Sequence, residues 1–187
     1  IAARQTDTNP SDAQKEAGNY SKGRIRIHGL EIAIENPKGS TRSGTDKDGK
    51  TWRCVLPAHY GDIKRSIGAD NDPVDCYIGD AHNSNTVYIV DQVDAKTGRF
   101  DEHKVMLDFP SKEVALAAYA KAFSDGKGKD RIGAVKQLSV EAFKEWLREG
   151  DTTKPAARFA DGGKVGMPRP GSKTSPRDQA IAAAMGV

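Results

Sequence analysis

Apolar and polar residues alternate over several short segments in the first two thirds of the chain, and this period of two predicts strands. The alternation across residues 24–34 is interrupted at Gly29. This segment is therefore either one long strand or a hairpin with a bulge near the glycine. Further strands are expected at 51–56, 74–78, 87–93 and 100–109. The segment 37–49 is rich in Gly, Ser and charge and is expected to be a loop.

The pattern then changes to a helical period. Ser111 and Ser139 each precede an amphipathic segment and are expected to cap a helix, and Gly150 is expected to end the second one. Strands followed by helices indicate an α+β fold. We expect a small antiparallel β-barrel of about five strands, similar to an OB fold, with two helices packed outside.

Polar segments flank this predicted core. Residues 1–22 are expected to form an extended arm with a short helix capped by Ser11. Residues 23–150 form the expected domain, and 151–187 form a Gly/Pro-rich basic tail with a short helix expected at 176–185. The net charge of +3 belongs to this tail, since the remaining residues carry equal numbers of acidic and basic side chains. A balanced core argues against nucleic-acid binding by the folded part.

Composition argues against two further classes of protein, those held together by disulfides and those that span a membrane with helices. Cys54 and Cys76 are the only cysteines, so the chain has no disulfide framework and fits a reducing compartment. No apolar run approaches the length of a membrane span.

The acidic run from Asp70 to Asp75 is the most informative motif. Asp70, Asp72 and Asp75 fall within six residues, with Pro73 among them. Such carboxylates repel one another unless cations lie between them, and hard divalent cations prefer oxygen ligands. The run therefore predicts a metal-dependent phosphate site. The alternative is a simple turn, because Asp, Asn and Pro are common turn residues.

Four motifs together resemble the soluble family I inorganic pyrophosphatases. The run 70–75 matches the signature Asp-x-Asp-Pro-hydrophobic-Asp, and 60–63 matches the preceding Tyr-Gly-x-Ile element. The segment 35–40 matches Glu-x-Pro-basic-Gly-Ser, and Glu102 with Lys104 matches the acid-x-Lys pair. Within this family the chain is most similar to the pyrophosphatase-like domain of large multidomain (polyvalent) phage proteins.

The resemblance implies a role for each matched residue. It implies several Mg²⁺ ions, with Mn²⁺ as a substitute, and a general base near the attacking water at Asp72. The implied metal ligands are Asp70, Asp75, Glu102 and Asp94, and Glu35 would bind metal through water. Asp101 would replace Glu102 if a bulge intervenes in the strand. The implied phosphate contacts are Lys38, Arg42, Arg53, Tyr60 and Lys104, of which Lys38 and Arg42 are alternatively solvated loop charges. Arg53, Tyr60 and Lys104 would act with Asp72 in catalysis.

The implied function is Mg²⁺-dependent hydrolysis of pyrophosphate, or of a related phosphoanhydride. The implied location is the cytoplasm (that of the host if the chain is phage-encoded) or a virion. The chain also departs from the family pattern: Ser43 replaces an expected lysine, and an expected late Tyr-Lys pair has no clean match near Phe123 and Ser124. The alternative is therefore a weakly active or inactive module. Such a module would be a virion or interaction component, with copies of itself or phage structural proteins as partners through its terminal arms.

Overall fold

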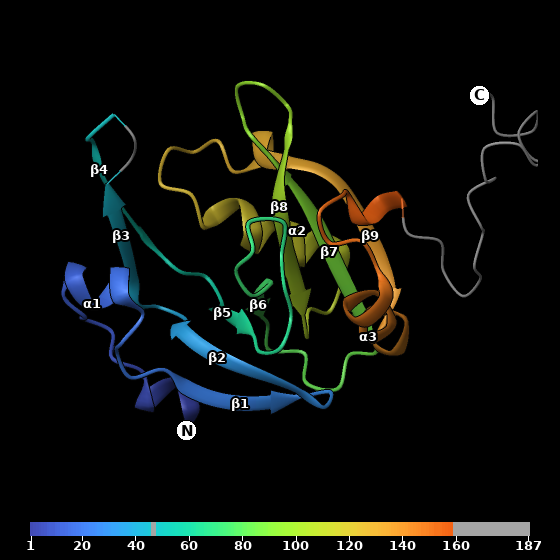
Figure 1. Ribbon diagram of the computed structural model, residues 1–187, viewed down its shortest axis with the longest axis horizontal. Coiled ribbons are helices and arrows are strands. Elements are labelled where there is room, and N and C mark those ends of the chain that lie inside the picture. Colours follow the sequence, from blue (N-terminus) through green and yellow to red (C-terminus); the bar gives the residue numbers. More distant parts are fainter. Residues whose placement is uncertain (46–47, 159–187) are drawn as a thin grey trace, which may run out of the picture.

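The computed structural model describes residues 1–45 and 48–158, which form a seven-stranded mixed sheet, a separate hairpin and helices on both faces (Figure 1). In spatial order the sheet consists of β1 (Gly23–Ile27), β2 (Leu30–Asn36), β5 (His59–Ile63), β6 (Asp75–Ile78), β8 (Phe100–Leu107), β7 (Thr86–Val93) and β9 (Ile132–Ser139). The hairpin pairs β3 (Thr41–Thr45) with β4 (Thr51–Val55). The helices are α1 (Asp12–Ala17), α2 (Lys112–Lys121) and α3 (Val140–Glu149), with short 3-10 turns at Ala2–Gln5, Lys129–Arg131 and Ala156–Arg158.

The α+β class is confirmed, but the five-stranded antiparallel barrel is wrong for the described part of the chain. The sheet is open there, with β1 and β9 at its two edges. It is also mixed, because β6 and β8 run parallel whereas the other neighbours are antiparallel. The edge strand β9 lies in a segment whose alternation is weak and in which no strand was expected.

The break at Gly29 is a hairpin turn. His28 and Gly29 both have positive φ (51° and 82°), and Ile27 pairs with Leu30 across them. Two residues of positive φ match the right-handed twist of the flanking strands. Of the two interpretations of residues 24–34, the hairpin is therefore correct.

The N-terminal segment is folded onto the sheet. The Thr6 hydroxyl donates to the carbonyl of Ile34 and accepts from the amide of Gly23, both at 3.0 Å. Ser11 caps α1 as expected. The expectation of an extended arm is therefore wrong where Thr6 ties the chain to the sheet, through hydrogen bonds that a polar count does not reveal. No residue of α1 is buried. The helix expected at 176–185 lies outside the described residues.

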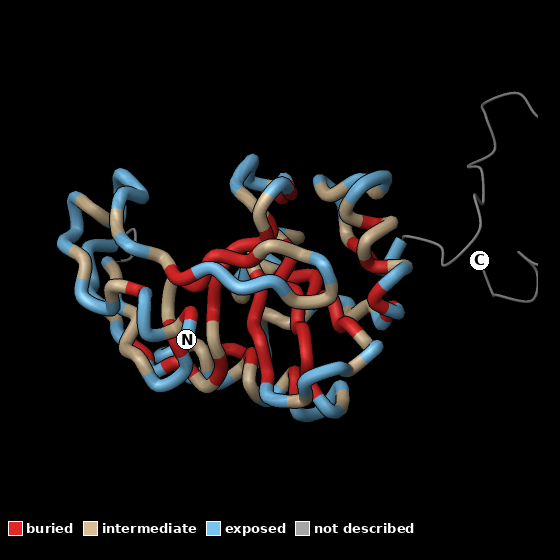
Figure 2. Tube along the Cα trace, turned by 90° about the horizontal axis from the view of Figure 1, so that it is seen from below, coloured by how far each residue is buried: buried red, intermediate tan, exposed pale blue. Residues whose placement is uncertain are grey.

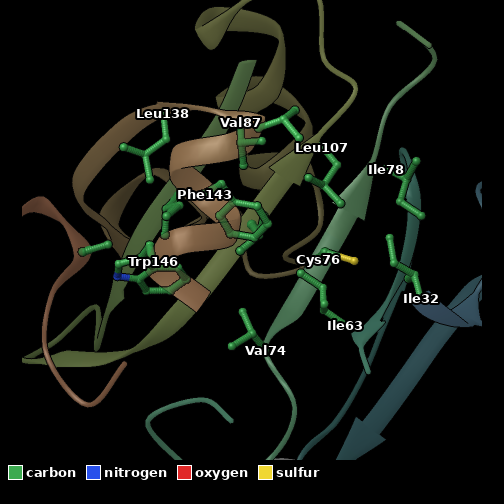
Figure 3. Packing of buried hydrophobic residues seen from close by; sticks show 14 residues of the cluster. Ile32, Ile63, Val74, Cys76, Ile78, Val87, Leu107, Leu138, Phe143 and Trp146 are labelled. Atoms are coloured by element: carbon green, nitrogen blue, oxygen red, sulfur yellow. The ribbon is translucent and has the colours of Figure 1, made fainter. Parts of the chain in front are cut away.

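Two apolar clusters lie on opposite faces of the sheet, and Figure 2 shows the buried strands at the centre of the molecule. Phe143 and Trp146 of α3 pack on one face, in the same cluster as Val87, Leu107 and Cys76 (Figure 3). Ala115 and Tyr119 of α2 cover the other face. Ser111 and Ser139 cap these two helices, as predicted. The central strands are thus buried on both sides.

No helix in residues 1–45 and 48–158 is both long and apolar enough to cross a membrane.

Candidate active site

A buried lysine, Lys104, joins two acidic side chains on the face of the sheet covered by α2. Parallel pairing of β6 with β8 places Asp75 directly beside Lys104. The Lys104 ammonium donates to Asp75, lies 2.7 Å from Glu102 Oε2 and donates to the Tyr60 hydroxyl at 3.3 Å. Burial alone would lower the pKa of Lys104, but its surroundings, including the carboxylates of Asp75 and Glu102, raise it well above the ordinary value. Lys104 is therefore a fixed positive charge.

Tyr60 completes the centre of this cluster from β5. Its hydroxyl donates to Asp75 Oδ2 at 2.5 Å, and its ring packs against Tyr77 with centroids 5.0 Å apart. Burial raises the pKa of Tyr60 well above its usual value and that of Tyr77 to about 12. Both phenols are neutral at physiological pH, so Tyr60 acts as a hydrogen-bond donor.

A β-bulge brings Asp101 and Glu102 to one side chain. Asp91 pairs with His103 and Val93 with Phe100, which leaves Gln92 opposite both acids. Gln92 Nε2 donates to Asp101 Oδ2 and to Glu102 Oε1, each at 3.0 Å. Burial raises the pKa of Glu102, while the Lys104 charge opposes the shift. The expectation of Asp101 as a ligand required a bulge in this strand. The bulge is present, and both Asp101 and Glu102 accept from the same Gln92 amide.

Three arginines lie around this acidic centre. The Arg42 guanidinium stacks over Tyr60, 4.7 Å from the ring centroid, and over Trp52 at 5.8 Å. Arg53 and Arg131 line the same cavity, and Arg131 forms two hydrogen bonds with Asp125 while lying over Phe123. The cavity has a volume of about 580 Å³. Its lining carries more basic side chains than acidic ones, and its acids are Glu102 and Asp125.

Asp70 and Asp72 belong to a loop outside this cluster. Both are exposed in the loop between β5 and β6, where the Asp72 amide donates to Asp70 Oδ1 at 3.1 Å and Asn71 has a φ of 69°. Within the described residues no ion pair or hydrogen bond links either side chain to Asp75, Glu102 or Lys104. Their predicted roles in metal binding and as a base stay predictions.

Three other predicted residues have different surroundings. Glu35 is ion-paired with Lys22 at 2.5 Å and lines a neighbouring cavity. Lys38 is ion-paired with exposed Asp80 at 2.5 Å and lines neither cavity. Asp94 Oδ1 accepts bonds from the amides of residues 96 and 97, which closes the β7–β8 turn. The structure does not bring Lys38 or Asp94 to the Lys104 cluster.

The sequence analysis missed four residues of the site: Trp52, Gln92, Tyr119 and Arg131. Tyr119 donates to Gln92 Oε1 at 2.8 Å and so orients its amide. None of the four belongs to the matched motifs, and only their position in the folded chain connects them with the acids.

The acids offer the oxygen ligands that Mg²⁺ prefers. Along residues 1–45 and 48–158, however, no three His, Cys, Asp or Glu side chains are grouped so that they could hold a metal ion. Lys104 lies between Asp75 and Glu102, and Gln92 lies between Glu102 and Asp101. The carboxylates are thus of the kind that bind a divalent cation. In this structure, however, the Lys104 ammonium and the Gln92 amide lie between them.

The chain matches the family model described as Inorganic Pyrophosphatase over residues 12–148. Among solved structures it is similar to an inorganic pyrophosphatase from Helicobacter pylori, with 20% identity over 68% of this chain and 94% of that chain and a TM-score of 0.39. It is also similar to an inorganic phosphatase from Anaplasma phagocytophilum, with 16% identity, coverage of 78% and 97%, and a TM-score of 0.36. No curated protein matches the chain. Because the family model spans most of its length, the chain belongs to the inorganic pyrophosphatase family of hydrolases.

Proposed function

We propose that this protein hydrolyses inorganic pyrophosphate to two phosphates with Mg²⁺ as cofactor. The observation that carries the proposal is the buried Lys104, which is joined to Asp75, Glu102 and Tyr60 and lines, with Glu102, a cavity that also exposes Arg42, Arg53 and Arg131. Pyrophosphate is compact and strongly anionic. A cavity with several basic side chains and nearby carboxylates suits such an anion when it arrives together with divalent cations.

Each side chain has a distinct task in this proposal. Lys104 donates hydrogen bonds to phosphate oxygens, Tyr60 positions Lys104 and Asp75 through its hydroxyl, and Arg42 and Arg53 hold the anion from the cavity wall. Asp72 accepts the proton of the attacking water from its exposed loop. Stabilisation is mainly electrostatic, since the donors are fixed before the substrate binds.

Asp70, Asp75, Glu102 and Asp101 are the proposed carboxylate ligands of Mg²⁺. When bound, the metal ions neutralise substrate charge and lower the pKa of a bound water. Lys104, whose ammonium lies between Asp75 and Glu102, would contact the substrate phosphate beside these ligands.

Phosphate release from pyrophosphate in Mg²⁺ tests this proposal. Wild-type protein is expected to turn over, and Asp72→Asn and Asp75→Asn are each expected to lose at least about 100-fold in kcat, the usual size of an acid–base contribution. Glu31→Gln is a suitable control, because Glu31 is ion-paired with Arg24 on the edge of the sheet and lines neither cavity. An Asp72→Asn variant as fast as wild type would contradict the base assignment.

The narrower resemblance to phage multidomain proteins gives the second candidate, a module without turnover. Its support is Gln92, whose neutral amide lies between two carboxylates where a cation would otherwise be expected. Purified wild-type protein that releases no phosphate with Mg²⁺ or Mn²⁺ would favour this candidate, with assembly through the terminal segments in the host cytoplasm or virion.

A further inference from the structure

The cavity above Lys104 adjoins a second and larger cavity. The second cavity has a volume of about 1170 Å³ and is lined by the N-terminal segment, the end of β2 and the β3–β4 hairpin. Four hairpin residues line both cavities: Arg42, Thr51, Trp52 and Arg53. The two spaces therefore share a boundary formed by the hairpin.

Pyrophosphate alone is too small to need both spaces. Pockets for drug-sized ligands typically have volumes of about 300–1,000 Å³, and the cavity above Lys104, at about 580 Å³, already falls in that range. A ligand that occupies both cavities must carry a further group on its phosphates.

The chemistry of the shared boundary indicates the nature of that group. Trp52 is half-buried, and its ring lies so close to Gly44 that a Cβ there would be 2.7 Å from Trp52 Cζ2. The absence of a side chain at Gly44 thus lets an aromatic ring lie along the boundary. Tyr20 adds a second ring to the wall, and Asn36 and Ser40 add polar groups. Aromatic rings are the usual stacking partners of nucleobases.

Arg42 connects the two halves. Its guanidinium lies 4.7 Å from the Tyr60 centroid on the phosphate side and 5.8 Å from the Trp52 ring on the other. We infer that this site takes phosphoanhydrides that carry a nucleoside, with the phosphates at Lys104 and Arg42 and the base against Trp52. The inference rests on the proposed function, because the phosphate half of the ligand uses the same cluster.

Tryptophan fluorescence tests the inference directly. The chain has two tryptophans, and Trp146 is 1% exposed in the cluster under α3, on the other face of the sheet. In Mg²⁺, adenosine 5′-(β,γ-imido)triphosphate is expected to quench wild-type emission in a saturable way, and Trp52→Phe is expected to abolish this change. In calorimetry, Trp52→Leu is expected to weaken the nucleotide analogue about 10-fold more than it weakens imidodiphosphate, a typical loss for one stacked base.

Val55→Ala is the matched control, because Val55 is on the same strand, is 63% exposed and lines neither cavity. It is expected to leave both affinities unchanged. Equal affinities of wild type for the two analogues, or equal weakening of both by Trp52→Leu, would overturn the inference. Hydrolysis of pyrophosphate without binding of the nucleotide analogue overturns the inference alone. Binding of the analogue through Trp52 without hydrolysis of pyrophosphate supports the inference and overturns the proposed function.

Discussion

The Tyr119 hydroxyl donates to Gln92 Oε1 at 2.8 Å, and this bond directs the Gln92 amide nitrogen toward two carboxylates. Asp101 and Glu102 each accept from that nitrogen at 3.0 Å. A neutral donor fixed by a buried phenol thus bridges the two acids, one of which, Glu102, is also paired with Lys104. Gln92 is 7% exposed, so the arrangement is set before any ligand arrives.

Replacing the amide by a carboxylate should change the affinity of the site for metal ions. Gln92→Glu would place a third carboxylate beside Asp101 and Glu102, where oxygen ligands favour a divalent cation. We expect the affinity for Mn²⁺ to rise at least about 10-fold, equivalent to about 1.4 kcal/mol, as measured by calorimetry or by the loss of the free Mn²⁺ signal in electron paramagnetic resonance. Gln92→Leu, which adds no ligand, should not show the gain. A Gln92→Glu affinity equal to that of wild type would be the contrary result.

Removal of Lys104 should cost both stability and turnover. Lys104→Met leaves Asp75 and Glu102 without their shared cation in a site that is largely buried. Breaking such a pair by removing one partner typically costs about 3–5 kcal/mol, and the loss is measurable as the change in free energy of urea unfolding. The exposed pair of Lys144 and Glu141 provides the comparison, since Lys144→Met should have a small effect. Similar losses in the two variants would show that the cluster is not a coupled unit.

Activity should fall when Arg42 is replaced by lysine, even though this substitution keeps the positive charge. Lysine at this position cannot stack its planar group on Tyr60 and Trp52 or bind phosphate with two parallel donors. Arg42→Lys is expected to lower kcat/KM for pyrophosphate at least about 10-fold, a loss of about 1.4 kcal/mol in transition-state stabilisation, in a phosphate-release assay. Arg65→Lys, at a side chain that is 89% exposed, should leave the rate unchanged. Full activity of Arg42→Lys would mean that charge alone matters.

His103 should make stability depend on pH between about 5 and 7. Its ring is buried between Phe100 and Trp146, and Nε2 lies 3.1 Å from the carbonyl of Lys154 and 3.4 Å from Asp91 Oδ1. Burial lowers the pKa of His103 below 6.5, against the opposing charge of Asp91. The unfolded chain therefore binds the proton more readily, and stability falls as pH falls below about 6.5.

The slope expected from this one group is at most about 1.4 kcal/mol per pH unit. Urea unfolding across this range measures it. His103→Phe should remove the His103 contribution whatever its effect on absolute stability, whereas His82→Asn, at a side chain that is 78% exposed, should retain it. A His103→Phe variant with the wild-type slope would assign the dependence to another group.

Local sequence signals predicted the elements that depend on local physics. Ser11, Ser111 and Ser139 cap helices because a hydroxyl can accept from an amide two or three residues ahead, which needs no tertiary contact. The alternation around Asp75 likewise determined that its side chain faces away from Cys76. Motif spacing led to Tyr60, Asp75, Glu102 and Lys104, which the structure brings into direct contact.

The sequence by itself therefore determined the α+β class and the helix starts, since periodicity and capping are local properties, whereas the charged centre of the site was implied by the resemblance to a family. Only the tertiary structure decided that the sheet is open and mixed, that Gln92 and Tyr119 join the acids, and that Lys38 pairs with Asp80 away from them. These features depend on strand order, on a bulge and on contacts between residues far apart in the chain. Pairing of distant segments is fixed by packing of the whole domain, which no local pattern encodes.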